Sequence, residues 1–288
     1  MPQRRALAAT KRAGPALALV LGAGGARGLS HVPVLEALDE LGVRPALIAG
    51  CSIGAIIGAA YAAGLSGRDL RDHVEASFRD RARVIARLLD ARVGKFTDLM
   101  RGLGNPVLID GERMLDLFWP EAVPDRFEDL AIPFSAMATD YHLHAECSLS
   151  SGPLTPAVAA SLAIPGLVRP IVLDGRVLID GAAINPLPYE ALLAPGRIVL
   201  AVDTSAPATV SDTRIPGPLE AMLGVSQILS RTLVQRMIER QPPDILIRAG
   251  VDGVGGLDFF KAQAILDASE PVKDEVKRRL AQALERAG

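Results

Sequence analysis

A serine flanked by two glycines carries the first chemical signal in the sequence. Residues 50–54 read Gly-Cys-Ser-Ile-Gly, a G-x-S-x-G pattern centred on Ser52, with apolar residues on both sides. This order predicts a strand, a sharp turn and a helix, which is the setting of the nucleophilic serine in α/β hydrolases. Gly50 and Gly54 would give the chain room to bend and present the Ser52 hydroxyl at a helix N-terminus. The alternative is a chance match in an alanine- and glycine-rich helix.

A glycine-rich loop over residues 22–28 offers groups that can stabilise negative charge. It follows the apolar run 16–21 and reads Gly-Ala-Gly-Gly-Ala-Arg-Gly. Consecutive glycines expose backbone N–H groups, which acyl transfer needs where charge develops on the carbonyl oxygen. A dinucleotide-binding loop would need glycine at Arg27 and an acid after the second strand, where residues 49–51 read Ala-Gly-Cys. A G-x-x-x-x-G-K-[ST] pattern is missing too, so nucleotide binding is the weaker interpretation.

The histidines favour a serine that is paired with an acid alone. In α/β hydrolases the histidine follows the acid along the chain, but the last histidine here is His144. A Ser-Asp-His triad would therefore need its acid and its histidine before residue 145. One candidate acid, Asp180, lies in the sequence Ile-Asp-Gly-Ala, but Asp-Gly pairs recur and do not single it out. The other histidines are His31, His73 and His142, and the other Asp-Gly pairs begin at Asp110, Asp174 and Asp252. No spacing of these residues indicates a metal site.

The order of the segments around these motifs predicts an α/β fold. Apolar runs at 16–21 and 45–49 are typical of buried strands, and each precedes a turn and a helix, at 29–41 and 55–63. This alternation implies parallel strands joined by helical crossovers. Further strands are predicted at 134–139, 142–149, 171–179 (a hairpin on an Asp-Gly turn), 197–202 and 244–248. Further helices are predicted at 68–89 (as one helix or two), from 110 to Pro120, at 219–241, and at 259–287 with a break at Pro271.

The composition is that of a globular chain. Its 288 residues carry a net charge of -2, which gives no global attraction to nucleic acid, and its two cysteines lie far apart. We predict a reducing, cytoplasmic setting, a disordered basic tail over 1–14 and a single domain over 15–288; a twin-arginine export signal is the alternative for the tail. The uncharged run 46–65 is long enough for a membrane span. Its alanine and glycine content favours instead a strand, a turn and a buried helix. No cofactor is expected.

The segment 78–95 is basic and has the pattern of an amphipathic helix. Three arginines would share one face of this helix and four apolar side chains would lie near the other. The arginines are Arg79, Arg83 and Arg87, and the apolar residues are Val84, Ile85, Leu88 and Leu89. Such a helix can rest on anionic lipid, although the favoured interpretation is a solvated helix that packs on the domain. The aromatic residues Phe118, Trp119, Phe259 and Phe260 fit either an acyl groove or an ordinary core.

Taken together, these motifs resemble those of the patatin-like phospholipase family, in particular of its bacterial branch. Residues 24–28 are similar to the family's oxyanion-hole motif, 50–54 to its serine motif and 180–182, Asp-Gly-Ala, to its Asp-Gly motif. The stretch from Ser161 to Pro188 also resembles bacterial members. The resemblance extends over roughly residues 16–205, and its motifs are specific because three of them occur in order.

The resemblance implies a three-layer α/β/α fold with a mostly parallel central sheet. It implies a serine acyl hydrolase of lipids, of the phospholipase or lysophospholipase type, which works through a Ser-Asp dyad and an acyl-enzyme. Ser52 would be the nucleophile and Asp180 its base. The oxyanion hole would be formed by the loop residues Gly24, Gly25, Arg27 and Gly28. Many members have glycine where this chain has Ala23, and a positive φ at that position would strain an alanine.

The same resemblance sets the expected partner and the alternatives. The partner is a lipid or acyl-ester substrate. The basic pattern of 78–95, rather than the resemblance, adds peripheral contact at the inner face of a membrane as an expectation. A small-ester carboxylesterase or thioesterase would use the same dyad. A non-catalytic lipid-binding protein is a further alternative, against which the intact Ser52 and Asp180 argue.

Overall fold

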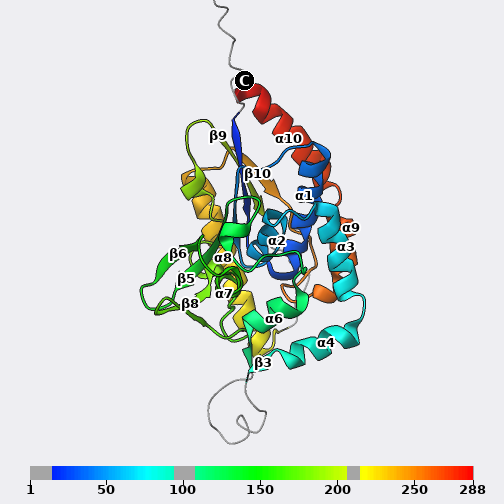
Figure 1. Ribbon diagram of the computed structural model, residues 1–288, viewed down its shortest axis with the longest axis vertical. Coiled ribbons are helices and arrows are strands. Elements are labelled where there is room, and N and C mark those ends of the chain that lie inside the picture. Colours follow the sequence, from blue (N-terminus) through cyan, green and yellow to red (C-terminus); the bar gives the residue numbers. More distant parts are fainter. Residues whose placement is uncertain (1–14, 94–107, 206–214, 288) are drawn as a thin grey trace, which may run out of the picture.

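The computed structural model describes residues 15–93, 108–205 and 215–287, so the predicted tail over 1–14 lies outside the described residues. Its main feature is an 8-stranded sheet of order β10-β9-β1-β2-β5-β8-β7, with β6 paired to β5 (Figure 1). The strands that pair in parallel are β1 (Ala16–Leu21), β2 (Leu47–Cys51), β5 (Phe134–Asp140), β9 (Arg197–Asp203) and β10 (Ile245–Arg248). Two strands pair antiparallel with β5, namely β6 (Ala145–Leu149) and β8 (Arg176–Asp180), and β7 (Ile171–Leu173) pairs antiparallel with β8.

Helices precede, follow and connect these strands. The α-helices in the described ranges are α1 (His31–Glu40), α2 (Ile53–Ala62), α3 (Gly67–Phe78), α4 (Arg81–Asp90), α6 (Gly111–Phe118), α7 (Leu154–Ser161), α8 (Pro218–Arg240), α9 (Ala262–Ser269) and α10 (Val272–Ala287). A small second sheet pairs β3 (Arg92–Val93) with β4 (Leu108–Ile109).

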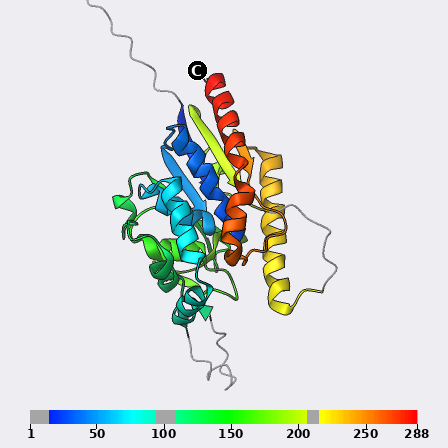
Figure 2. The same ribbon diagram turned by 90° about the vertical axis from the view of Figure 1, so that its right-hand side faces the viewer.

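The strand β1 shows why helices cover both faces of the sheet. Leu17, Leu19 and Leu21 pack in one hydrophobic cluster with side chains of α1, α2 and α10. Ala18 and Val20 pack in a second cluster with side chains of α8. Because alternate side chains of a strand point to opposite faces, an uninterrupted apolar strand must be covered on both. Figure 2 shows α1, α3 and α10 side by side on one face. The three-layer α/β/α prediction is therefore confirmed.

The pairing of β5 brings distant parts of the chain to one place. β6 pairs along one edge of β5, so that β2 and β8 must share the other edge. On that shared edge, Cys51 of β2 pairs with Met137, and Asp180 of β8 pairs with the next residue, Ala138. The carboxyl ends of β2 and β8 therefore meet at adjacent positions of β5. This seam places the residue after Cys51 beside Asp180.

The glycine loop differs from its prediction, and the structure decides between two alternatives for the helical segment 68–89. Residues 25–30, predicted mainly as loop, form a 3-10 helix that leads into α1. Of the two alternatives for residues 68–89, one helix or two, the structure shows two, α3 and α4. Asp80 begins the second helix, because its side chain accepts a hydrogen bond from the backbone N–H of Arg83.

Two further expectations concern the uncharged run and a strand. The run 46–65 consists of β2, the turn at Ser52 and α2, as predicted. No helix in the described part of the chain is long and apolar enough to span a bilayer. The strand predicted over 142–149 begins only at Ala145. The carboxylate of Asp140 binds two backbone N–H groups of the intervening turn, which takes the turn residues out of the sheet.

Candidate active site

Ser52 occupies the tight turn between β2 and α2. Its φ of 56° and ψ of -121° lie in a backbone region that side chains rarely adopt. A Cβ at Gly50 would overlap the carbonyl oxygen of Gly54, and a Cβ at Gly54 would overlap that of Leu21. Both glycines are therefore required by the close approach of β1, β2 and α2. The turn leaves the Ser52 hydroxyl at the N-terminus of α2, where the helix dipole favours negative charge.

Ser52 and Asp180 are joined by a hydrogen bond at the seam of the sheet. The Oγ of Ser52 donates to Oδ2 of Asp180 over 2.8 Å, although 128 positions separate the two residues along the chain. The other carboxylate oxygen, Oδ1, accepts the backbone N–H of Ala182 at 2.8 Å. Each member of the pair is 5% exposed. Within the described ranges, neither is bonded to a histidine. The acid is thus held in place with one oxygen directed at the serine.

Burial changes the acid strength of Asp180. Removal of the carboxylate from water disfavours its charged form and raises its pKa to about 6, and the hydrogen bonds from Ala182 and Ser52 offset only part of this effect. A carboxylate of that pKa is a stronger base than an ordinary aspartate and is still mostly ionised at neutral pH. Burial and the charge of Asp180 also raise the pKa of the Cys51 thiol. Cys51 is thereby kept as an unreactive neutral thiol.

Ser161, at the end of α7, holds the backbone of the serine turn. Its hydroxyl accepts the backbone N–H of Ser52 at 2.9 Å and donates to the carbonyl of Met137 at 2.6 Å. Ser161 is completely buried, and its two hydrogen bonds tie α7 and β5 to the turn. Sequence reasoning assigned no role to this residue. A single serine at the end of an alanine-rich helix carries no pattern that would reveal the contact.

The glycine loop packs closely against the serine turn and the cavity beside it. Gly28 lies against Ile53, and a Cβ at Gly28 would overlap that side chain. Gly25 has a φ of 58°, and a Cβ there would overlap the carbonyl oxygen of Gly256. Gly25 also shares the lining of one cavity with Ser52. Glycine is therefore required at both loop positions, for space at Gly28 and for space and conformation at Gly25.

Two neighbouring backbone N–H groups of the loop point to no acceptor in the described structure, and the N–H groups on either side of them are hydrogen-bonded. The N–H of Ala23 donates to the carbonyl of Pro186 at 2.9 Å, and that of Ala26 donates to a loop carbonyl at 2.8 Å. The N–H groups of Gly24 and Gly25 find no acceptor among the residues that the structure describes. The φ of Ala23 is not positive, so alanine is accommodated there without strain. The loop thus presents two free donors at the start of a 3-10 helix.

Arg27 and His31 fasten this loop from the protein interior. The guanidinium of Arg27 donates to the carbonyl of Thr204 at 3.3 Å and to the side chain of Gln227 in α8 at 3.2 Å. The Nε2 of His31 donates to the carbonyl of Gly22 at 2.9 Å. Complete burial lowers the pKa of His31 to about 4, so the imidazole stays neutral. Both side chains support the loop from behind.

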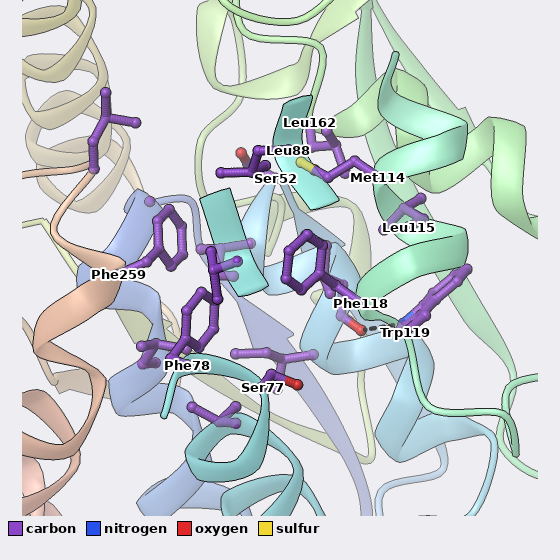
Figure 3. Close-up of a pocket in the computed structure, with 18 of the residues that line it drawn as sticks. Ser52, Ser77, Phe78, Leu88, Met114, Leu115, Phe118, Trp119, Leu162 and Phe259 are labelled. Carbon is purple, nitrogen blue, oxygen red and sulfur yellow. Dashed lines mark hydrogen bonds between the residues drawn. The ribbon is translucent and has the colours of Figure 1, made fainter. Parts of the chain in front are cut away.

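An apolar cavity of about 340 Å³ lies beside Ser52 (Figure 3). Side chains from α2, α3, α4, α6 and residues 256–260 line it. Among the described residues, no Asp, Glu, Lys or Arg belongs to this lining. Besides Ser52, the lining includes the imidazole of His73 and the hydroxyl of Ser77, both from α3. The Nε2 of His73 donates to the carbonyl of Phe118 at 2.6 Å. The cavity therefore fits an uncharged, apolar ligand.

A row of three stacked phenylalanines forms part of the cavity wall. Phe78 lies between Phe118 and Phe259, with ring centroids 6.2 Å and 5.6 Å away (Figure 3). Trp119 and Phe260 line the same cavity. The four aromatic residues for which the sequence left groove and core open therefore all line this cavity, and Trp119 and Phe259 also pack against the hydrophobic core.

The basic segment differs from its prediction as a single helical face. Arg79 precedes α4 and does not share a helical face with Arg83 and Arg87. Arg87 donates to a backbone carbonyl of α6 at 2.7 Å and lies over the ring of Phe118. Lys95 lies outside the described residues.

The apolar residues of α4 are divided between the interior and the solvent. Val84 is buried and Leu88 lines the cavity. Ile85 and Leu89, predicted to lie near the packed face, are instead 50% and 48% exposed. The helix is therefore both a wall of the cavity and an exposed apolar surface.

Comparison with known proteins points to one family. The family model described as patatin-like phospholipase matches residues 19–193. An uncharacterised NTE family protein of Mycobacterium tuberculosis is 38% identical over 192 residues, which cover 67% of this chain and 49% of that protein. Lysophospholipase NTE1 of Kluyveromyces lactis is 28% identical over 278 residues, covering 88% of this chain and 18% of that protein. The ExoU–SpcU complex of Pseudomonas aeruginosa matches with a TM-score of 0.47 and 14% identity, over 94% of this chain and 52% of that one. The chain thus spans about half the length of its mycobacterial relative.

Proposed function

The chain belongs to the patatin-like phospholipase family, and we propose that it is a serine hydrolase that cleaves fatty-acyl esters of lipids. The observation that carries this proposal is the hydrogen bond between Ser52 and Asp180, formed beside an apolar cavity. A relative that bears the name lysophospholipase supports the same substrate class.

In the proposed reaction, Asp180 takes the hydroxyl proton of Ser52 as Oγ attacks the ester carbonyl. The tetrahedral intermediate collapses, the alcohol leaves with the proton from Asp180, and the acyl group remains on Ser52. A water molecule then gives its proton to Asp180 and attacks the acyl-enzyme. The fatty acid is released and Ser52 regains its proton. A pKa of about 6 suits Asp180 for both proton transfers, because neither its acid nor its base form is strongly disfavoured.

The free N–H groups of Gly24 and Gly25 are the proposed donors to the oxyanion. They belong to a loop that shares the cavity lining with Ser52 and makes no other use of these two groups within the described structure. Loss of one such donor typically lowers turnover by ~100–1000-fold. Arg27 and Gly28 contribute by shaping the loop, Arg27 through its side-chain hydrogen bonds and Gly28 through its contact with Ile53.

The apolar cavity supports an acyl chain as the group bound next to Ser52. A lining that lacks charged side chains throughout the described residues would not compensate a phosphate or a nucleotide. The lining consists largely of aromatic and aliphatic side chains, which would contact a long acyl chain over more of its surface than a short one. A carboxylesterase or thioesterase would share the dyad, and the dependence of kcat/KM on acyl length separates these activities.

We also propose that the basic segment contacts the lipid surface that holds the substrate. Arg79, Arg81 and Arg83 are exposed, and they stand close to the exposed Ile85 and Leu89 of α4. Cationic and apolar side chains on one element are typical of peripheral binding to anionic membranes. Because α4 also walls the cavity, this contact would bring the cavity to the lipid.

The first test is hydrolysis of a short p-nitrophenyl ester by the wild-type protein, by Ser52→Ala and by Cys51→Ala, followed by phospholipid vesicles. We expect Ser52→Ala to lose turnover by at least ~10³-fold. Cys51→Ala, which changes the neighbouring buried residue, should retain it within a few-fold. Equal turnover in the wild type and Ser52→Ala would refute the nucleophile and favour the non-catalytic lipid-binding alternative.

A further inference from the structure

We propose that the outer face of the first half of α8, residues 221–230, is a docking surface for a lipid bilayer. Docking through this surface would place the opening of the cavity at the membrane. This inference rests on the proposed function, because it assigns a role to surface residues around the same cavity. It concerns a helix that neither the serine motif nor the basic segment includes.

The first half of α8 has an unusual composition for an exposed helix. From Ala221 to Ser230 it carries no charged residue. Its solvent-facing positions include four large apolar residues, and Ile228 and Leu229 are 66% and 58% exposed. The other two are Met222 and Val225. A helix on the surface of a soluble domain normally places charged residues there, as the second half of α8 does with Arg236, Glu239 and Arg240.

The inner side of the same half-helix contacts the candidate active site. Ser230 donates to the carbonyl of Ala182, whose N–H binds Asp180. Gln227 accepts from Arg27 of the glycine loop. The inner side of α8 thus contacts residues that adjoin Asp180 and the glycine loop. A surface that docks here holds the active site next to the membrane.

Further exposed apolar residues continue this face around the cavity. Met222 lies against Gly166, in a loop whose side chains line the cavity. Leu257 and Phe260 belong to the cavity lining and are themselves exposed. Arg81 at the start of α4 lies 5.5 Å over the ring of Phe260, which links this face to the exposed apolar residues of α4. Of the other exposed large apolar residues in the described ranges, Ile215 lies just before α8, and the rest are Leu41, Tyr141, Leu143, Val172 and Leu284.

The chemistry of this surface fits lipid. Contiguous exposed apolar side chains with a charged rim mark interaction surfaces. At the start of α4 the exposed Arg79, Arg81 and Arg83 outnumber the one exposed acid among them, Asp80, and this net positive charge suits anionic headgroups. The apolar cavity matches an acyl chain that leaves a bilayer. Two weak signals, apolar insertion and basic attraction, together give stable peripheral binding.

The test is co-sedimentation of the protein with phosphatidylcholine vesicles, with and without phosphatidylglycerol. Leu229→Glu places a charge on the proposed docking surface. Leu143→Glu is its matched control, because Leu143 is 71% exposed in the turn between β5 and β6. We expect Leu229→Glu to weaken vesicle partitioning by roughly tenfold or more. Leu143→Glu should bind as the wild type does, and both variants should hydrolyse a soluble short ester at the wild-type rate.

Two outcomes would overturn the inference. One is equal vesicle binding by Leu229→Glu and the wild type. The other is a wild-type dimer in sedimentation velocity that Leu229→Glu converts to monomer while vesicle binding stays unchanged, which would assign the face to a second copy of the chain. Ser52→Ala separates docking from catalysis, because it should bind vesicles fully even where it hydrolyses nothing. Docking can therefore fail while the proposed chemistry holds, and the reverse.

Discussion

Replacement of Asp180 by asparagine should have opposite effects on turnover and on stability. The side chain of asparagine has nearly the same shape, and its oxygen can still accept the N–H of Ala182. Its amide nitrogen, however, donates to Ser52 and cannot take the proton of Oγ. We therefore expect kcat for a soluble ester to fall by roughly 10³–10⁴-fold. The wild-type turnover should rise with pH to a plateau, with a midpoint near the pKa of about 6.

The size of the stability effect follows from the pKa of Asp180. Burial raises it from an ordinary 3.8 to about 6, which corresponds to about 3 kcal/mol between the two protonation states. Because the folded-state pKa lies above the unfolded one, the neutral acid contributes stability that is fully present below about pH 4. That contribution is lost as the pH rises through about 6. At pH 8 the asparagine variant should therefore unfold about 5 °C higher than the wild type.

Thermal unfolding of the wild type and Asp180→Asn between pH 4 and pH 8 measures this effect. The difference in Tm should grow from pH 4 to about pH 6 and stay constant above it. Asp174→Asn is the matched control, since Asp174 is exposed in the turn of the neighbouring hairpin. It should change neither turnover nor the pH dependence. A Tm of Asp180→Asn that is lower than that of the wild type at pH 8, or turnover within tenfold of it, would refute the reasoning.

Three further predictions concern the surroundings of the dyad. Gly25→Ala should lower kcat by ~100–1000-fold because its Cβ would displace the loop; Gly42→Ala, with a similar positive φ of 64° but open space around it, should leave kcat unchanged. Ser161→Ala should lower Tm by several degrees, because it leaves the buried N–H of Ser52 and the buried carbonyl of Met137 without their partner. It should also lower kcat more than it changes KM. Phe78→Ala opens the aromatic wall, and across a series of p-nitrophenyl esters it should shift the highest kcat/KM to longer acyl chains. An unchanged length profile would show that this wall does not limit the chain.

The serine turn is predictable from sequence because its requirements are local. An apolar strand, two glycines around one serine and an apolar helix are contiguous in the chain, and the observed close approaches at Gly50 and Gly54 explain that pattern. The cap at Asp80 is also local, but short polar residues cap helices too often for the sequence to decide between one helix and two over residues 68–89.

Asp180 could be singled out only through the family resemblance. Its position depends on the register of β8 on β5, a long-range pairing that no local pattern encodes. Other Asp-Gly aspartates have unrelated tasks: Asp110 caps α6, and Asp174 occupies a hairpin turn with a φ of 50°. Ser161 was missed for the same reason, because its contacts join α7, β5 and the serine turn.

The exposed apolar residues of α4 and α8 were unpredictable for a different reason. Helical periodicity predicts which side chains share a face, but the direction of that face is set by tertiary packing. In α4 the pattern placed Ile85 and Leu89 near the packed side, and the structure exposes both. In α8 apolar residues occur on both sides, so no single face stands out in the sequence.

The seam between β2 and β8 also has a consequence for how the chain folds. The hydrogen bond between Ser52 and Asp180 closes a loop of 128 positions, and contacts of such long range form late in folding. The helices, whose hydrogen bonds are local, can form before the two ends of this long loop meet. Recovery of esterase activity after dilution from denaturant should therefore lag behind recovery of the far-ultraviolet circular dichroism. The candidate active site would in that way report the formation of long-range tertiary contacts, whereas the circular dichroism reports the helices and strands.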